Sequence, residues 1–258
     1  MRRQGQLRNT HLAREQRSGR CIPVSDEGVV VPLTGIARTA AKHMARAWQA
    51  PVFHVTVEVD MTEAMKVKSV EPTATVTDAI VAAAATALIE FPEVNVHVGE
   101  DELVRFDAIN IGIAVASPKG LVVPNVHDAA NKSLAELATA RADIVSRARD
   151  GALARPDISN GTFTISNLGM MGITRFDAIL NVPQAAILAV GATIDRFVGG
   201  ADNAHWAPIA ELTLTCDHRA LDGATGAKFI GAVKAALESP LPSSDLTATQ
   251  RASLVGAR

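Results

Sequence analysis

A histidine and an aspartate lie four residues apart near the C-terminal end of the chain, in the run DHRALDG from Asp217 to Gly223. An imidazole near a fixed carboxylate can act as a general base in catalysis. The same two residue types also occur as a hydrogen-bonded structural histidine and a helix cap. The spacing alone is a weak signal, so it leaves both interpretations open.

The surrounding sequence places this run between a strand and a helix. Polar and apolar residues alternate from Ile209 to Cys216, which predicts a strand. Apolar residues then recur at three- and four-residue steps from Phe229 to Leu237, which predicts a helix. His218 therefore follows the strand directly. Asp222 lies near the start of the helix, where a carboxylate is a favourable cap.

Longer stretches of the chain resemble one family of enzymes. The stretch TLTCDHRALDGATGAKF and the blocks Gly161 to Gly191 and Phe106 to Leu137 are similar to the dihydrolipoyl acyltransferases. These are the core components of 2-oxo acid dehydrogenase complexes. The histidine–aspartate part also resembles the chloramphenicol acetyltransferases. Together with two upstream blocks, the similarity extends from Val31 to Pro240 in the order of the family.

The resemblance implies transfer of a small acyl group, with acetyl favoured, between dihydrolipoamide and coenzyme A. His218 would be the general base, and Ser166 would donate a hydrogen bond to the oxyanion of the tetrahedral intermediate. From its local sequence alone, Ser166 is better explained as a turn hydroxyl before Asn167-Leu168-Gly169, and only the resemblance favours the oxyanion donor. It is not in a GxSxG motif, so nothing marks it as a nucleophile of a serine hydrolase.

Four further side chains complete the predicted site. By resemblance, Asp222 would order the site by pairing with a basic residue that the family provides as arginine. Lys68 occupies that position here. Lysine cannot form the bidentate pair that arginine forms with a carboxylate. Arg219 and Asn167 are expected to organise the site without reacting.

The order of predicted helices and strands indicates an α+β fold, with one mixed sheet and helices packed on one side. The resemblance implies a chloramphenicol acetyltransferase-like trimer. We expect a disordered N-terminal arm or linker over residues 1–28, the catalytic domain over 29–240 and a polar C-terminal tail over 241–258. Because this tail lacks an apolar cluster, we expect trimers that do not assemble further.

Within the domain, local signals predict the ends of several elements. We expect a strand over Val29–Leu33 and a helix capped by Thr34. A second helix should begin at Thr77, and Ser133 with Glu136 forms the capping box of a third. A hairpin is expected around the acidic turn GEDE.

The resemblance also implies the partners. Coenzyme A would be a substrate, and the active site would lie between the subunits of a homotrimer. The lipoyl group would be carried on a separate domain, supplied in trans or on a missing N-terminal part. The 2-oxo acid dehydrogenase subunits would be further partners.

Composition argues against several other classes of protein. The net charge of −2 gives no electrostatic case for nucleic acid or an anionic membrane. Two cysteines, Cys21 and Cys216, do not make a disulfide framework, which fits the cytoplasm. Cys216 is predicted to be a buried strand residue. No metal is expected, because the spacing of His205, Cys216 and His218 matches no recognised metal-ligand pattern.

Two alternatives to the main hypothesis stay open. The chain could be a related acyltransferase that uses an acyl carrier protein or a small-molecule acceptor. It could instead be a non-catalytic scaffold core of a dehydrogenase complex.

Overall fold

The computed structural model describes residues 29, 31–33, 35–118, 120–200, 204–241, 243 and 245–255. The chain divides into two units, Met1–Thr34 and Gly35–Arg258. In the first unit, the described residues 29 and 31–33 are exposed and form no strand, so the strand predicted there is wrong. The predicted arm over 1–28 and the cap Thr34 lie outside the described residues. The following account concerns the second unit.

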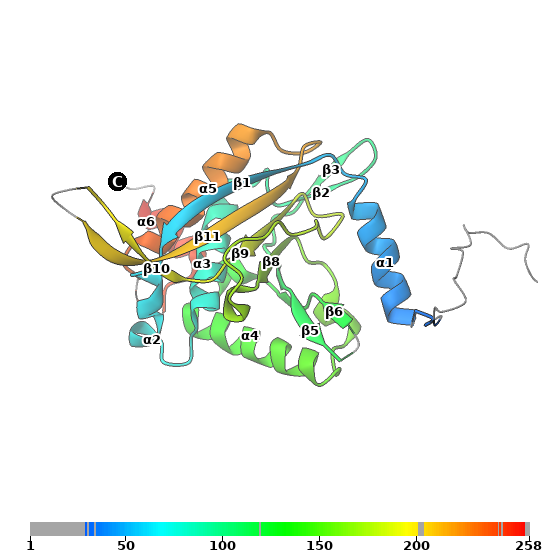
Figure 1. Cartoon of the computed structure of the whole chain (residues 1–258), viewed down its shortest axis with the longest axis horizontal. Helices are drawn as coiled ribbons and strands as arrows, with labels where there is room; N and C mark the ends of the chain where they lie inside the picture. The colour runs from blue at the N-terminus through cyan, green and yellow to red at the C-terminus, as the bar shows by residue number, and fades with distance from the viewer. Residues whose placement is uncertain are drawn as a thin grey trace, which may run out of the picture. The chain divides into compact units, whose positions relative to one another are not determined.

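A mixed sheet lies at the centre of this unit (Figure 1). Within the described residues it has seven strands in the order β1-β11-β9-β8-β4-β7, with β10 also paired to β11. The strands are β1 Val52–Asp60, β4 Ile111–Ile113, β7 Asn125–Val126, β8 Phe163–Asn167, β9 Ala186–Val190, β10 Ile194–Val198 and β11 His205–Asp217. β8 runs parallel to β4 and β9, and the other pairs are antiparallel. The predicted mixed sheet is confirmed.

Two short hairpins stand outside the main sheet. β2 (Val96–Val98) pairs with β3 (Leu103–Arg105) around the acidic turn, as predicted. β5 (Val115–Ser117) pairs with β6 (Gly120–Val122).

Most helices cover one face of the sheet. They are α3 Val76–Glu90, α4 Leu134–Arg149, α5 Gly223–Glu238 and α6 Ala248–Val255, and α2 Val67–Val70 is a single turn after β1. α3 is apolar almost all round and its alanines are buried, so neighbouring backbones can approach closely. α6 lies in the segment expected to be a polar tail, and its Ala248 is buried in the main core.

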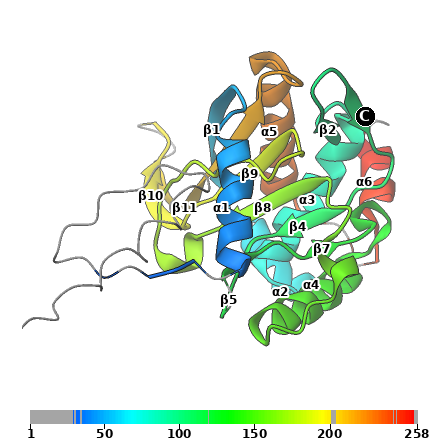
Figure 2. The same ribbon diagram turned by 90° about the vertical axis from the view of Figure 1, so that its right-hand side faces the viewer.

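α1 (Gly35–Ala47) lies away from these helices (Figure 1, Figure 2), and among its described side chains only Ala47, its last residue, is buried. The predicted packing of helices on one side of the sheet is therefore confirmed for the helices that cover it. The alternation in β9 separates the two faces. Leu188 joins the large core beneath α3, α4 and α5, whereas Ile187 and Ala189 join a smaller cluster with Ala47 of α1 and Leu180. We call the face that carries Ile187 and Ala189 the open face.

The capping boxes show where local prediction succeeded and where it failed. Ser133 and Glu136 form the predicted box at the start of α4. At the start of α3 the cap is Thr75, not Thr77 as predicted. The physical reason is Asp78, whose carboxylate accepts hydrogen bonds from the backbone N–H and hydroxyl of Thr75. This choice places Asp78 at the third helical position that a capping box requires.

Candidate functional site

His218 lies exposed in the turn that follows β11, where the sequence predicted it. Its backbone N–H donates a hydrogen bond to the carbonyl of Pro51 at 2.8 Å. Its ring packs on that of Phe53, with the ring centroids 4.8 Å apart. The start of β1 therefore fixes both the backbone and the ring of His218, while solvent can reach the imidazole.

The residues on either side of His218 form an ion pair that closes the turn. Asp217 is buried, and its carboxylate accepts hydrogen bonds from the backbone N–H, Nε and Nη2 of Arg219 at 3.0, 2.9 and 2.6 Å. Hydrogen bonding to Asp217 raises the pKa of Arg219 above its usual value. The ion pair between Arg219 and Asp217 thus fixes the backbone on both sides of His218.

Asp222 caps α5, as predicted. Its carboxylate accepts a hydrogen bond from the backbone N–H of Thr225 at 2.7 Å. This bond is the main reason why the pKa of Asp222 is lowered, with a smaller contribution from the charge of His218. Asp222 therefore stays ionised and anchors the end of the turn.

Lys68 is not brought to Asp222 within one chain. Val52 at the start of β1 pairs with Asp217, whereas Asp60 at its end pairs with Ile209. The nine residues of β1 span about 26 Å at roughly 3.3 Å per residue, and Lys68 follows the far end. Among the described residues no ion pair joins Lys68 to Asp222.

Ser166 and Asn167 end β8 on opposite faces of the sheet. Ser166 is half-buried on the open face, level with Ala189 of β9. Asn167 points toward the helices, where its Oδ1 accepts from the N–H of Gly169 at 2.9 Å and its Nδ2 lies 3.4 Å from the hydroxyl of Thr77. Within the described part of the chain, the hydroxyl of Ser166 has no hydrogen-bond partner.

Strand register separates Ser166 from His218 within one chain. Ser166 is level with Ala189, and Ala189 is level with Thr213 of β11, five residues before His218. Two strand spacings and five residues along a strand give a separation of about 19 Å. A base and an oxyanion donor that act on one carbonyl must each lie within about 3 Å of reacting atoms. A single chain therefore does not bring the two residues to one substrate.

Sequence reasoning missed the contributions of Pro51, Phe53 and the carboxylate of Asp217. An aromatic residue shortly after a proline, at the start of a predicted strand, is the one local signal that was available. That this strand pairs with the end of β11 depends on long-range register, which no short motif contains.

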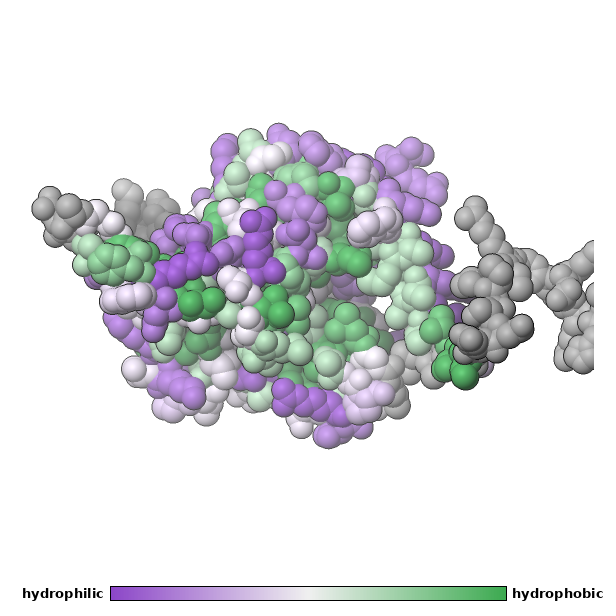
Figure 3. Space-filling view, viewed as in Figure 1, coloured by the Kyte–Doolittle hydropathy of each residue, from purple (hydrophilic) through white to green (hydrophobic). Residues whose placement is uncertain are grey.

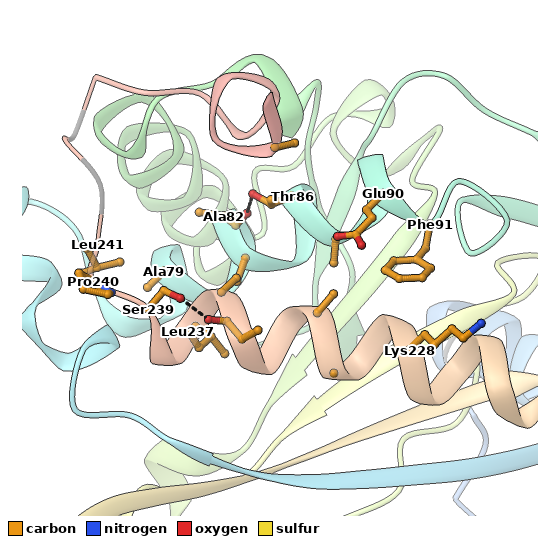
Figure 4. Close-up of a pocket in the computed structure, with 17 residues that line it drawn as sticks. Ala79, Ala82, Thr86, Glu90, Phe91, Lys228, Leu237, Ser239, Pro240 and Leu241 are labelled. Carbon is orange, nitrogen blue, oxygen red and sulfur yellow. Dashed lines mark hydrogen bonds between the residues drawn. The ribbon is translucent and has the colours of Figure 1, made fainter. Parts of the chain in front are cut away.

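Two cavities of the described residues lie away from the imidazole of His218 and the hydroxyl of Ser166. One of about 920 Å³ lies between α3 and α5 and is lined mostly by alanines, with Glu90 and Lys228 toward one end (Figure 4). Alanine side chains cannot supply acid–base chemistry. A second, of about 310 Å³, borders Arg219 and the acidic turn Glu100–Asp101–Glu102.

Other candidate chemistry is limited in the regions that can be described. No three His, Cys, Asp or Glu side chains of the described residues come together as a metal site. His205 and His218 lie at opposite ends of β11. Burial raises the pKa of the Cys216 thiol to about 12, which argues against a thiolate nucleophile. Across the described segments, no helix is long and apolar enough to cross a membrane.

Comparison with known proteins identifies a family. Residues 8–243 match the model of the 2-oxoacid dehydrogenases acyltransferase catalytic domain. The dihydrolipoyllysine-residue acetyltransferase component of the pyruvate dehydrogenase complex from Rickettsia felis is 37% identical over 225 residues, which are 83% of this chain and 55% of that protein. The chain thus spans about half the length of the curated relatives it matches.

Solved structures show the same relationship. A structure of the dihydrolipoamide acetyltransferase of Azotobacter vinelandii matches with a TM-score of 0.78 and 30% identity, over 85% of this chain and 97% of that one. A chloramphenicol acetyltransferase matches with a TM-score of 0.55 and 15% identity, over 76% of this chain and 94% of that one, which shows the shared fold. The chain therefore belongs to the family of 2-oxoacid dehydrogenase acyltransferase catalytic domains.

Proposed function

We propose that this chain is a dihydrolipoyllysine-residue acetyltransferase, which moves an acetyl group between dihydrolipoamide and coenzyme A. The observation that carries the proposal is the geometry of His218. Its ring is exposed, yet the turn around it is fixed by Pro51, Phe53 and the ion pair of Asp217 with Arg219. A histidine held in place but open to solvent suits a general base.

The reaction requires one proton to move in each direction. His218 takes the proton of the coenzyme A thiol as the thiolate sulfur attacks the thioester carbonyl of acetyl-lipoamide. Ser166 donates a hydrogen bond to the oxyanion of the tetrahedral intermediate. As that intermediate collapses, the bond to the lipoyl sulfur breaks, and His218 returns the proton to this sulfur. The products are acetyl-coenzyme A and dihydrolipoamide.

The separation of about 19 Å between Ser166 and His218 supports a site shared between two copies of the chain. The Azotobacter structure concerns the role of a serine, a histidine and an asparagine in the catalytic mechanism of that enzyme. Its serine precedes its histidine by the same number of residues as Ser166 precedes His218, and its asparagine follows by four, as Asp222 does here. This agreement supports the assignment of all three positions.

The wider assembly belongs to the same proposal. We infer a homotrimer with the site between subunits, a lipoyl group carried on a separate domain, and 2-oxo acid dehydrogenase subunits as partners. The cytoplasmic location rests on the low cysteine content.

The test measures the rate of acetyl transfer from acetyl-coenzyme A to dihydrolipoamide. It compares this rate with the rate of acetyl transfer to an acyl carrier protein under the same conditions. We expect transfer to dihydrolipoamide. Faster transfer to the carrier protein would favour the alternative of a related acyltransferase that uses an acyl carrier protein. Unchanged activity in His218→Ala would contradict the role of His218 as the base.

Mixed oligomers test the shared site directly. His218→Ala and Ser166→Ala chains are each expected to be nearly inactive, but each retains the residue that the other lacks. If copies meet head to tail, random mixing restores about a quarter of the wild-type activity, because one interface in four joins the two intact residues. A mixture that exchanges subunits yet remains as inactive as its parents would place the site within one chain.

A further inference from the structure

His43 is a half-buried histidine on α1 that the proposed mechanism does not use. Its Nε2 lies 3.0 Å from Oδ1 of Asn181, which is far away in the sequence. Among the described side chains of α1 only Ala47 is buried, and Figure 3 shows weakly apolar and polar residues mixed on the surface of this helix. Because so little of α1 is buried, the hydrogen bond to Asn181 is important for holding the helix on the sheet.

Asn181 continues this contact into the interior as a chain of hydrogen bonds. Its Nδ2 donates to the hydroxyl oxygen of Thr164 in β8 at 3.1 Å. The hydroxyl of Thr164 in turn donates to Oε1 of Gln184 at 2.6 Å. Thr164 and Gln184 are both buried, so a partner lost at either residue would leave a buried polar group unpaired, which is costly. The chain therefore links a helix at the surface to the buried part of the open face.

The packing around Gly161 fixes the direction of these hydrogen bonds. A Cβ on Gly161 would lie 2.2 Å from Oδ1 of Asn125 and 3.1 Å from Nε2 of Gln184, so both atoms face the space that the glycine leaves. The amide nitrogen of Asn125 donates to two backbone carbonyls, which leaves its oxygen on the side of Gln184. An acceptor there favours the amide nitrogen of Gln184 on that side and turns Oε1 toward Thr164.

This direction determines which atom of His43 carries a hydrogen. Oε1 of Gln184 only accepts, so the single hydrogen of the Thr164 hydroxyl points toward it. The hydroxyl oxygen must then accept from Nδ2 of Asn181, and Oδ1 of Asn181 is left facing His43. Because Oδ1 also only accepts, Nε2 of His43 must carry a hydrogen. The chain thus requires a donor at the position of this one nitrogen.

The chain ends beside Ser166. Thr164 and Ser166 lie on the same face of β8, two residues and about 7 Å apart. The residues on either side of Asn181 pack in the small cluster that contains Ala189, and Ala189 is the β9 residue level with Ser166. A shift of Asn181 therefore changes the packing next to the Ser166 hydroxyl. A misplacement of about 1 Å at a reacting group can cost a large factor in rate.

We propose that His43 is a positioning residue for acyl transfer. Its Nε2–H holds Asn181, Asn181 holds the hydroxyl of Thr164, and the chain thereby fixes the open face beside Ser166. The inference rests on the proposed function in one respect, namely that Ser166 donates a hydrogen bond to the oxyanion. His43 acts only through these neighbours, so it is not a catalytic residue.

Two amide substitutions in the full chain test the donor by its reach. The amide nitrogen of glutamine can take the place of Nε2, whereas the side chain of asparagine is one methylene too short. His43→Asn should lower kcat roughly five- to tenfold, the weight of one hydrogen bond, with little change in KM. His43→Gln should recover most of this loss. Lys42→Asn is the matched control, because Lys42 is the exposed neighbour on α1 and the change lowers helix propensity without touching the chain.

Amide hydrogen exchange, followed by mass spectrometry, gives a readout that does not depend on activity. In His43→Asn, exchange should become faster in residues 176–183 and 163–167, which contain the other members of the chain and their neighbours. Exchange in α4 and α5 should stay as in the wild type. A general loss of stability would instead raise exchange throughout the unit.

A double-variant cycle tests whether the two side chains act together. Asn181→Ala removes the acceptor of His43 and the donor to Thr164, so it should lower kcat at least as much as His43→Asn. Once Asn181 is lost, adding His43→Asn should change kcat by less than about twofold. Losses that simply multiply would show that the two residues act independently, which overturns the inference.

The remaining outcomes separate this inference from the proposed function. Equal kcat values in His43→Asn and His43→Gln, an equal loss in Lys42→Asn, or unchanged exchange in His43→Asn would each overturn the inference, while acetyl transfer by the wild type would leave the proposed function intact. If the wild type transfers no acetyl group, the proposed function fails. Faster local exchange in His43→Asn, restored in His43→Gln, would then still support the chain that starts at His43.

Discussion

The side chain of His218 is held by contacts within its own chain, whereas the hydroxyl of Ser166 has no hydrogen-bond partner among the described residues. Around the histidine, the carbonyl of Pro51, the ring of Phe53 and the pair of Asp217 with Arg219 hold both backbone and ring. The hydroxyl of Ser166 has no partner within the described residues, and exposed methionines follow it in the chain. One chain alone thus positions the base. Under the proposed function, the oxyanion donor would gain its surroundings from a neighbouring copy.

The largest expected effect is the loss of the base. His218→Ala should lower kcat by about 100- to 10,000-fold, the usual contribution of a general base. Because His218 is exposed, its removal should leave the unfolding midpoint nearly unchanged. Steady-state kinetics and thermal unfolding of the same preparation would measure both. Retention of activity within about tenfold would remove His218 from the role of base.

Loss of the hydroxyl of Ser166 should have a smaller effect. Ser166→Ala should lower kcat by roughly 100- to 1,000-fold, about 3 kcal/mol of transition-state stabilisation, with little change in KM. Ser166→Thr keeps a hydroxyl and serves as the conservative control. If Ala and Thr at this position behave alike, Ser166 is a turn hydroxyl and the comparison with His218 no longer holds.

The same contrast explains what the sequence alone can predict. Ser133 with Glu136, and Asp222 at the start of α5, were found because a cap and its helix are neighbours in the chain. At the start of α3, both Thr75 and Thr77 could have been the cap. Thr75 is the cap because the carboxylate of the buried Asp78 accepts hydrogen bonds from it. Local patterns define an element well but choose poorly between adjacent ends.

The distances between site residues on different strands depend on the long-range register of the sheet, which no short motif contains. We expected Lys68 to pair with Asp222. The register of β1 on β11 places the first residue of β1 beside Asp217, whereas Lys68 follows the last residue of β1, so the two side chains are far apart within one chain. The distance between Ser166 and His218 follows from the order β8-β9-β11, which the sequence could not provide. The segment that contains α6 was expected to be a polar tail because its sequence is polar and interrupted by proline. The single buried alanine in it, Ala248, gives no periodic signal that would have indicated the helix.

Removal of the ion pair between Asp217 and Arg219, beside His218, should have a moderate effect on stability and activity. Arg219→Ala leaves the carboxylate of Asp217 buried with only a backbone donor, which should lower the free energy of unfolding by about 1–3 kcal/mol. The loosened turn should also lower kcat more than it changes KM. Arg219→Lys restores the charge without the bidentate geometry, so it should recover part of each loss. Urea unfolding and kinetics of the three proteins would measure this. Full activity in Arg219→Ala would show that the turn needs no such support.

The smallest effect is expected at Asp222, and it depends on pH. The folded chain lowers the pKa of Asp222, mainly through the hydrogen bond from Thr225, so ionisation of this group stabilises the fold. That contribution is present above the ordinary pKa of an aspartate, about 3.9, and is lost as the pH falls through the lower folded value. Asp222→Asn keeps a cap oxygen without the charge and should retain most of the activity. Its melting temperature should lie below that of the wild type at pH 6 and converge with it below about pH 4, whereas Asp222→Ala loses the cap and should lie lower at both. Inactivity of a well-folded Asp222→Asn protein would mean that the carboxylate takes part in the proton transfer and does more than hold the turn.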